Sequence, residues 1–313
     1  AAELNLLDGV TSLSSGATNV NGLSDGLVED NSIYIGNDPT STTSTAQYNV
    51  ALGLTALDAV TTGDNNTAVG RNSLTSLTTG FENDAFGSAA LQDVTSGARN
   101  TALGSSAMLV NTTGANNTAI GRIALMSCLA SDNSAIGREA GRDITTGGHN
   151  TCLGRSAAEQ LSTGSNNTAI GFNAARSGQV FYLTTQSNRV VIGNDDITNI
   201  YGKVSFTSTS DKRDKVDFGT VPHGLDFVNK LKPVSYKWNE DDGKTHYGLI
   251  AQDVEETVID IGKTVSDFGA VSKEDDSPMG LGYSELISPL IKAVQELTAK
   301  NDALEARIKT LEG

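Results

Sequence analysis

The chain has 313 residues with 22 Lys and Arg against 37 Asp and Glu, a net charge of −15, and only 37% hydrophobic and 5% aromatic residues. The length suits two or three domains, but these fractions are too low for one large globular core. The acidic balance argues against DNA, RNA or anionic lipid as a partner, because no basic face is available to displace counterions. No run of about 18 apolar residues is present, so we expect no membrane-spanning segment.

The first residues, AAELNLLDGV, lack the basic segment that opens a secretory signal peptide, and the chain does not start with Met. We therefore expect residues 1–313 to be the tail end of a longer polypeptide. Residues 1–30 are expected to form an N-terminal connector.

Composition changes near position 205. Residues 1–202 contain no lysine, and 33 of the 103 positions in 211–313 are charged, against 26 of 210 in 1–210. The sequence therefore predicts two structurally different regions that are joined at this point.

The first region is a repeat with the pattern Asn-x-small-apolar-Gly. Successive repeats are 17 residues apart, with one step of 16, and end at Gly53, Gly70, Gly87, Gly104, Gly121, Gly137, Gly154 and Gly171. A second glycine, seven residues before the next repeat glycine, is missing only at Ala130, inside the shortened repeat. Each unit is predicted to form a three-residue strand, a glycine turn, a short Ala/Leu stretch and a Thr-Thr-Gly turn.

One unit can bury only two or three apolar groups, such as Ala68, Val69 and Leu74, so it cannot offset its ordering entropy alone. Stacked units cover one another, and eight coils at a strand spacing of roughly 4.8 Å make a rod of about 40 Å. Two related segments, NSIYIGND (31–38) and NRVVIGND (188–195), bracket the repeats and are expected to protect the open strand edges. We expect a capping β segment over 31–48, β-roll repeats over 49–178 and a β transition segment over 179–209.

One asparagine recurs four residues before each repeat glycine. Either these side chains stack into a ladder of amide hydrogen bonds, or each forms a local turn. They are Asn49, Asn66, Asn83, Asn100, Asn117, Asn133, Asn150 and Asn167.

The two cysteines are expected to be small buried side chains. Cys152 stands where other repeats carry Ala, and Cys128 is interpreted in the same way, with a metal site or a disulfide as the alternative. The glycines form no phosphate-binding loop followed by a long helix, so we expect no cofactor and no metal.

The repeat resembles the left-handed parallel β-roll heads of trimeric bacterial adhesins, and more closely the roll segments of bacteriophage fibres, over about residues 49–178. This resemblance implies a mainly β protein, a left-handed parallel β-roll or solenoid of about eight 17-residue repeats, and a homotrimer.

Three later blocks resemble the intramolecular chaperone domain of phage tailspikes and fibres, of the endosialidase type: KVSFTSTSDKRDK (203–215), LKPVSYKWNEDDGKTHYGLIAQDVEE (231–256) and YSELISPLIKAVQELTAKNDALEARI (283–308). The resemblance implies a small α+β domain over 210–313 that assists folding and trimerisation of the fibre and is then released by self-cleavage. Carried over by position, it implies Ser210 as the nucleophile and Lys215 as its base, with Asp211 and Arg213 completing the motif.

The chemistry sets a condition on this site. A serine hydroxyl needs a base, and a lysine serves only when neutral, so its pKa must fall through burial or a cationic neighbour such as Arg213. Reaction within one chain benefits from a high effective molarity. The alternative is that SDKRDK is a solvated turn.

The last helix, about 286–312, shows three heptads of a parallel coiled coil. With Val294, Asn301 and Ile308 at a positions, leucines occupy the d positions: Leu290, Leu297, Leu304 and Leu311. β-branched residues and Asn at a favour two strands, whereas both resemblances imply three. We expect three, because so short a coil follows the assembly imposed by the rest; a surface helix of a monomer is the alternative.

We therefore expect a homotrimeric viral tail fibre segment for host attachment. Its partners would be copies of itself, other virion tail or fibre proteins and a host cell-surface receptor or glycan, without nucleic acid or membrane insertion. It would reside in the virion, and in the host cytoplasm during assembly.

Two other functions remain open. A tailspike depolymerase of surface polysaccharide needs paired carboxylates on one groove, and the roll offers only scattered acids, Glu82, Asp84, Glu139, Asp143 and Glu159. A bacterial trimeric surface adhesin would need a membrane-anchoring barrel after the coil, and we expect none because the sequence ends at Gly313.

Overall fold

The computed structural model describes residues 26–29, 31–36, 45–179, 181–203, 208, 210–239, 243–273 and 278–313. Its internal contacts divide the chain into two compact units, Ala1–Ile200 and Tyr201–Gly313. The predicted connector, residues 1–30, lies outside the described residues except for 26–29.

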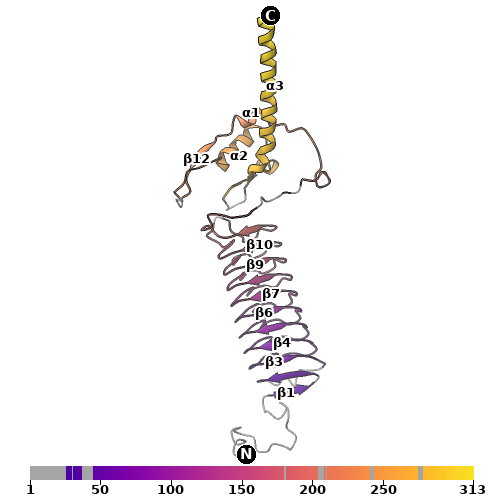
Figure 1. The fold of residues 1–313 in the computed structure, drawn as a ribbon. Helices are drawn as coiled ribbons and strands as arrows, with labels where there is room; N and C mark the ends of the chain where they lie inside the picture. Colours follow the sequence, from indigo (N-terminus) through magenta and orange to yellow (C-terminus); the bar gives the residue numbers. More distant parts are fainter. Residues whose placement is uncertain are drawn as a thin grey trace, which may run out of the picture. The chain divides into compact units, whose positions relative to one another are not determined.

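The first unit is a parallel β-solenoid of about eight turns (Figure 1). Strands β2 to β11 pair in parallel in chain order, and β1 pairs antiparallel with β2. The sequence therefore predicted the solenoid correctly, and its handedness stays a prediction. In the described part of this unit the strands are β1 (Gly26–Glu29), β2 (Ser32–Ile35), β3 (Val50–Leu52), β4 (Thr67–Val69), β5 (Asp84–Phe86), β6 (Thr101–Leu103), β7 (Thr118–Ile120), β8 (Ser134–Ile136), β9 (Thr151–Leu153), β10 (Thr168–Ile170) and β11 (Val190–Ile192).

The core of the solenoid consists of columns of small and branched apolar side chains. The central residue of each repeat strand is buried, as are the residues four and seven places after most repeat glycines. Ala68, Leu74 and Leu77 are the members contributed by one coil, and all three are fully buried. The expectation that Val69 is also buried is wrong: it is partly exposed, because successive strand residues point to opposite sides of the sheet.

The repeat glycines allow the coils to approach one another closely. Gly70 has a φ of 129°, and a Cβ built on it would lie 2.6 Å from the carbonyl oxygen of Gly87 in the next coil. Any side chain at this corner would therefore force adjacent coils apart, which explains why glycine recurs there.

The two predicted terminal segments supply β2 and β11. Each strand pairs in parallel with the neighbouring coil, β2 with β3 and β11 with β10. β1 folds back on β2 and covers the N-terminal edge of the parallel stack. A covered edge is less available for pairing with a foreign strand.

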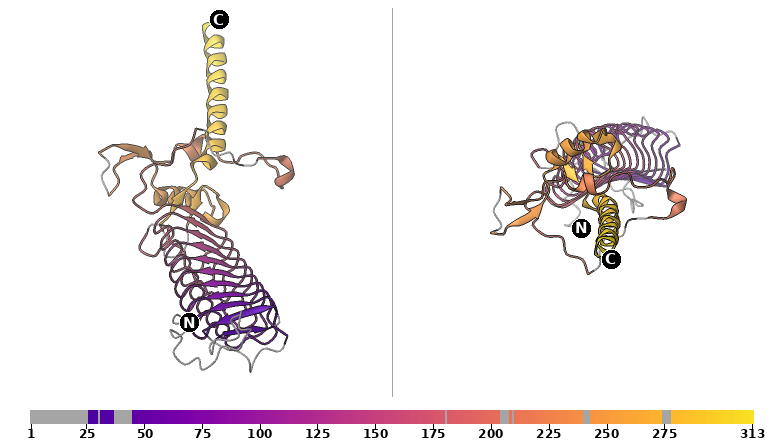
Figure 2. Two further views of the ribbon diagram at one scale, coloured as in Figure 1. Left: turned by 60° about the horizontal axis from the view of Figure 1, so that its bottom comes forward. Right: turned by 90° about the horizontal axis from the view of Figure 1, so that it is seen from above.

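The second unit is small, contains helices and ends in one long helix (Figure 2). Its two antiparallel strand pairs are β12–β13 and β14–β15, and Val254, Val258 and Val271 form a compact core. The elements described there are η3 (Lys212–Asp214), α1 (Leu225–Val228), β12 (Val234–Tyr236), β13 (His246–Gly248), α2 (Ala251–Asp260), η4 (Val265–Asp267), β14 (Val271–Ser272), β15 (Gly280–Leu281), η5 (Tyr283–Leu286) and α3 (Ile287–Glu312). None of the helices in the described residues is both long and apolar enough to cross a bilayer.

Candidate functional site

The serine and the lysine predicted to act together lie side by side. The short helix η3 turns the chain between them, and Lys215 Nζ donates a hydrogen bond of 2.7 Å to Ser210 Oγ. Their spacing of five residues therefore places a potential base on a potential nucleophile.

The other two predicted site residues pair with each other. Asp211 caps η3 by accepting from the backbone N–H of Arg213 at 2.8 Å, and its carboxylate also binds the Arg213 guanidinium, with the shortest contact at 2.6 Å. These bonds lower the pKa of the Asp211 carboxyl and raise the pKa of Arg213. The pair fixes the turn that joins Ser210 to Lys215.

In a single chain, the surroundings of Lys215 do not favour its neutral form. Ser210 and Lys215 are exposed, and the positive charge of Arg213, the expected cationic neighbour, is offset by Asp211. The geometry for a serine–lysine reaction is therefore present, but the desolvation is not.

The histidines of this unit lie elsewhere. His223 packs against the rings of Phe227 and Phe268, with centroid distances of 5.7 and 6.1 Å, and His246 stacks on Tyr236 at 5.5 Å. Both side chains therefore pack against aromatic rings, and neither lies beside the Ser210–Lys215 pair in the contacts described.

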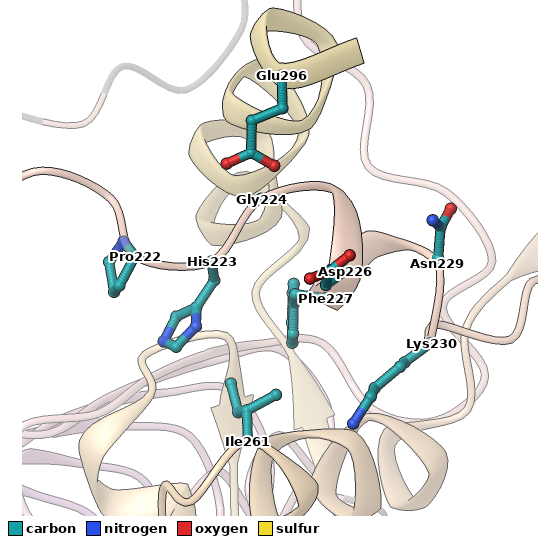
Figure 3. Close-up of a pocket in the computed structure, with 9 residues that line it drawn as sticks. All are labelled: Pro222, His223, Gly224, Asp226, Phe227, Asn229, Lys230, Ile261 and Glu296. Carbon is teal, nitrogen blue, oxygen red and sulfur yellow. The ribbon is translucent and has the colours of Figure 1, made fainter. Parts of the chain in front are cut away.

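A pocket of about 560 Å³ lies where α1 meets α3 (Figure 3). Gly224, the residue before α1, offers no side-chain cap, and Glu296 of α3 replaces it by accepting from the backbone N–H of Leu225 at 2.8 Å. Phe227 and Ala293 are buried where these helices meet. We call this contact the Glu296 cap; sequence reasoning missed it, because its two partners are 71 residues apart.

The predicted coiled-coil positions of α3 are exposed in the single chain. Leu290 is 53% exposed and Leu304 55%, and Val294, Leu297, Ile308 and Leu311 are also exposed. Pro289 and Ala293, on another side of the helix, are buried. The helix therefore presents an unpartnered apolar stripe while a different face holds the rest of the unit.

The solenoid carries a second exposed apolar surface, which we call the apolar row. It consists of the third residue of each parallel strand, and strand register places these residues side by side across ten strands. Leu52 is 49% exposed and Ile170 37%, whereas Ile35, Val69 and Ile120 of the same row are partly buried. The row consists of Ile35, Leu52, Val69, Phe86, Leu103, Ile120, Ile136, Leu153, Ile170 and Ile192.

Four of the five acids considered for polysaccharide cleavage form ion pairs with arginines. Glu139 pairs with Arg138 at 2.6 Å, which lowers the pKa of its carboxyl, and Asp143 pairs with Arg142 at 2.7 Å. Glu159 is buried and forms ion pairs with Arg142 and Arg176, and Glu82 pairs with Arg99 at 2.9 Å. Such cleavage needs a proton-donating acid and a second carboxylate on one groove, and arginines occupy these side chains instead.

The two cysteines are free and buried. Burial raises the pKa of the Cys128 thiol to about 11 and that of Cys152 to about 12. Within the described ranges, no group of three or more His, Cys, Asp and Glu side chains could hold a metal ion. Both thiols therefore serve as small core side chains.

One comparison with known proteins identifies part of the chain. Residues 210–263 match the family model described as the chaperone of endosialidase, and this match begins at Ser210. Neither a curated protein nor a solved structure matches the chain. The family match and the solenoid of about eight turns together fit a tail fibre with a C-terminal chaperone domain, and the family implies a homotrimer.

Proposed function

We propose that this chain is part of a homotrimeric bacteriophage tail fibre that attaches the virion to its host. The solenoid would be a shaft or a receptor-contacting head, and residues 210–313 an intramolecular chaperone that aligns three chains. The observation that carries the proposal is the chaperone match directly after a repetitive solenoid with an exposed apolar row.

The apolar row supports assembly. A continuous exposed row of this kind is unusual for a monomer and typical of an interaction surface. Burying the exposed part of each side chain, half of it or less, is worth up to roughly 1 kcal/mol, so the row contributes on the order of 5 kcal/mol or more per chain before the cost of association. In a second copy packed in parallel and in register, each residue of the apolar row would face the row of the first copy at the same level.

The exposed stripe of α3 supports the same assembly. Its a and d positions are unpartnered in one chain, as expected for a helix that completes its core with two other copies. A parallel coil also fixes the relative register of the chains that carry it.

Such alignment matters for folding. A parallel solenoid makes few contacts until neighbouring coils stack, and three chains wound out of register would bury the wrong residues together. A chaperone that brings the chains together in phase lowers the entropic cost of these non-local contacts.

We further propose that the chaperone is released by one self-cleavage event. Ser210 Oγ attacks the carbonyl carbon of the peptide bond that adjoins Ser210, Lys215 Nζ takes the hydroxyl proton, and the C–N bond breaks as this proton passes to the leaving nitrogen. Water then hydrolyses the ester. The exposed dyad would become active once assembly buries Lys215 and favours its neutral form.

Denaturing gels of freshly expressed protein test this step. Wild-type chain should yield fragments of about 210 and 103 residues, whereas Ser210→Ala should remain intact because the nucleophile is absent. Ser208→Ala, a nearby serine outside the dyad, should cleave like wild type. One intact band in every sample would remove the proteolytic step and leave the chaperone role standing.

The polysaccharide depolymerase has weaker support. Glu139, Asp143 and Glu159 form ion pairs with arginines, and the partner of Glu82 is Arg99. A bacterial adhesin would share the apolar row, but the chaperone match favours the fibre.

A further inference from the structure

A column of arginines follows the glycine corners of three consecutive coils. Arg122, Arg138 and Arg155 each come directly after a repeat glycine, and Phe172 occupies the same place in the next coil. Their backbones stack directly, since the carbonyls of Arg122, Arg138 and Arg155 accept hydrogen bonds of 3.1, 2.9 and 3.0 Å from the following coils. We call these four residues the arginine column.

Among the described residues, only the middle arginine of the column has a carboxylate partner. Arg138 pairs with Glu139 at 2.6 Å, and the guanidinium of Arg155 lies 5.1 Å from the centre of the half-exposed Phe172 ring. In the part of the chain that the structure describes, neither Arg122 nor Arg155 forms an ion pair, and both side chains are exposed.

The column is not explained by the fold. Residues 1–202 contain eight basic side chains, and five of them lie between 122 and 176. Arg138 is neutralised by Glu139, so Arg122 and Arg155, two coils apart, are the column's two cations without a carboxylate partner among the described residues. A different residue at the same corner, such as Ser88 or Ser105, gives the same backbone, so the turn itself does not need these arginines.

We propose that the arginine column binds an acidic polysaccharide, with its carboxylates held by Arg122 and Arg155 and a sugar ring packed against Phe172. This inference rests on the proposed attachment function and gives it a ligand class. The planar guanidinium suits a carboxylate, with which it forms two parallel hydrogen bonds. A polymer with regularly repeated carboxylates can reach both Arg122 and Arg155, which lie two coils apart.

The surroundings favour a glycan over nucleic acid. The net charge of −15 opposes a long polyphosphate, and the column offers two cations without a carboxylate partner, whereas nucleic-acid binding needs an extended basic surface. The apolar row residues precede the glycine corner and the arginines follow it, so the column lies outside the row assigned to chain–chain contact.

Binding of polygalacturonate to the full-length chain tests the inference, with neutral dextran as the uncharged polymer. The variant Arg122→Gln/Arg155→Gln should lose about tenfold or more in affinity. Arg71→Gln is the matched control, because Arg71 occupies the same corner position between Leu54 and Ser88 and should change affinity less than about twofold. Wild-type affinity should fall as NaCl rises from about 50 to about 200 mM.

Several results would overturn the inference: no binding by wild type at low salt, equal binding of dextran, a double variant within about twofold of wild type, or a DNA oligonucleotide that binds as well as the polyuronate. The mass of the same samples in solution separates this failure from that of the proposed function. A trimer that does not bind polygalacturonate would overturn this inference alone, whereas a monomer would overturn the proposed fibre.

Discussion

At the scale of single residues, the buried asparagines hold successive coils together. Asn100 Nδ2 donates to Asn83 Oδ1 at 3.1 Å and to the Gly114 carbonyl at 2.8 Å, while its own Oδ1 accepts from the backbone and side chain of Asn117. These bonds all join neighbouring coils, as the ladder interpretation predicts. A buried amide with every partner satisfied stabilises the stack.

The ladder has one interruption, at the shortened repeat. Asn133 still donates its backbone N–H to Asn117 Oδ1 at 2.9 Å, but its Nδ2 turns to Ser131, Gly147 and the Cys128 sulfur. Removing one residue from the coil thus breaks one rung while the strands remain paired.

Replacing a rung should destabilise the solenoid. Asn100→Ala leaves the donors of Asn117 without their partner in the core and the Gly114 carbonyl with only the longer 3.4 Å bond from Asn111. We therefore expect a loss of about 2–4 kcal/mol in unfolding free energy. The control is Thr113→Ala, at an exposed position in the Thr-Thr-Gly turn that ends at Gly114. It should change stability by less than about 0.5 kcal/mol. Equal effects in denaturant unfolding would contradict the ladder's role.

The buried thiols give a pH-dependent prediction. Because their folded pKa values of about 11 and 12 exceed the ordinary value of 9.0, the neutral thiols stabilise the fold fully below pH 9, and this contribution is lost as pH rises through 11 and 12. A thiol reagent at neutral pH should label neither cysteine of the native protein and both after denaturation. Rapid labelling of the folded chain would show that these side chains are not in the core.

At the scale of elements, α3 performs two tasks on different faces. Its a and d residues are exposed for assembly, while Pro289, Ala293 and Glu296 hold α1, the first α-helix after the dyad. Gly224 leaves room for this contact, since a Cβ there would lie 2.6 Å from Cδ of Glu296 and would displace the carboxylate. The carboxylate cannot move aside without losing its bond to Leu225.

A double-mutant cycle tests the Glu296 cap. Gly224→Ala and Glu296→Ala should each cost about 1–2 kcal/mol, the first by displacing the carboxylate and the second by removing it. In the double variant the added methyl meets no carboxylate, so the combined loss should be smaller than the sum by about 1 kcal/mol. Thermal unfolding of the four proteins gives these values, and strict additivity would show that the two residues act independently.

At the scale of the whole molecule, periodicity explains what the sequence predicted well. The interval between repeat glycines reveals the strand of each coil, and the Asn column and the central alanines follow from it. The apolar row was missed because Val69 was counted as core, although strand alternation puts it opposite the buried Ala68. The Glu296 cap depends on contacts between distant segments, which no local pattern encodes.

The dyad shows a different limit of prediction. A spacing of five residues brought Ser210 and Lys215 together, but it gave no sign that Asp211 would neutralise Arg213 or that the lysine would be exposed in one chain. In the proposed assembly, burial of this site would come from other copies, which the local sequence pattern does not describe.

The central claim is that three copies assemble through the apolar surfaces, and the mass in solution tests it most directly. Sedimentation equilibrium of the full-length Ser210→Ala variant, which keeps the chain intact, should give three times the chain mass of 32.5 kDa. A folded, compact species of 32.5 kDa that persists as concentration rises would contradict the account.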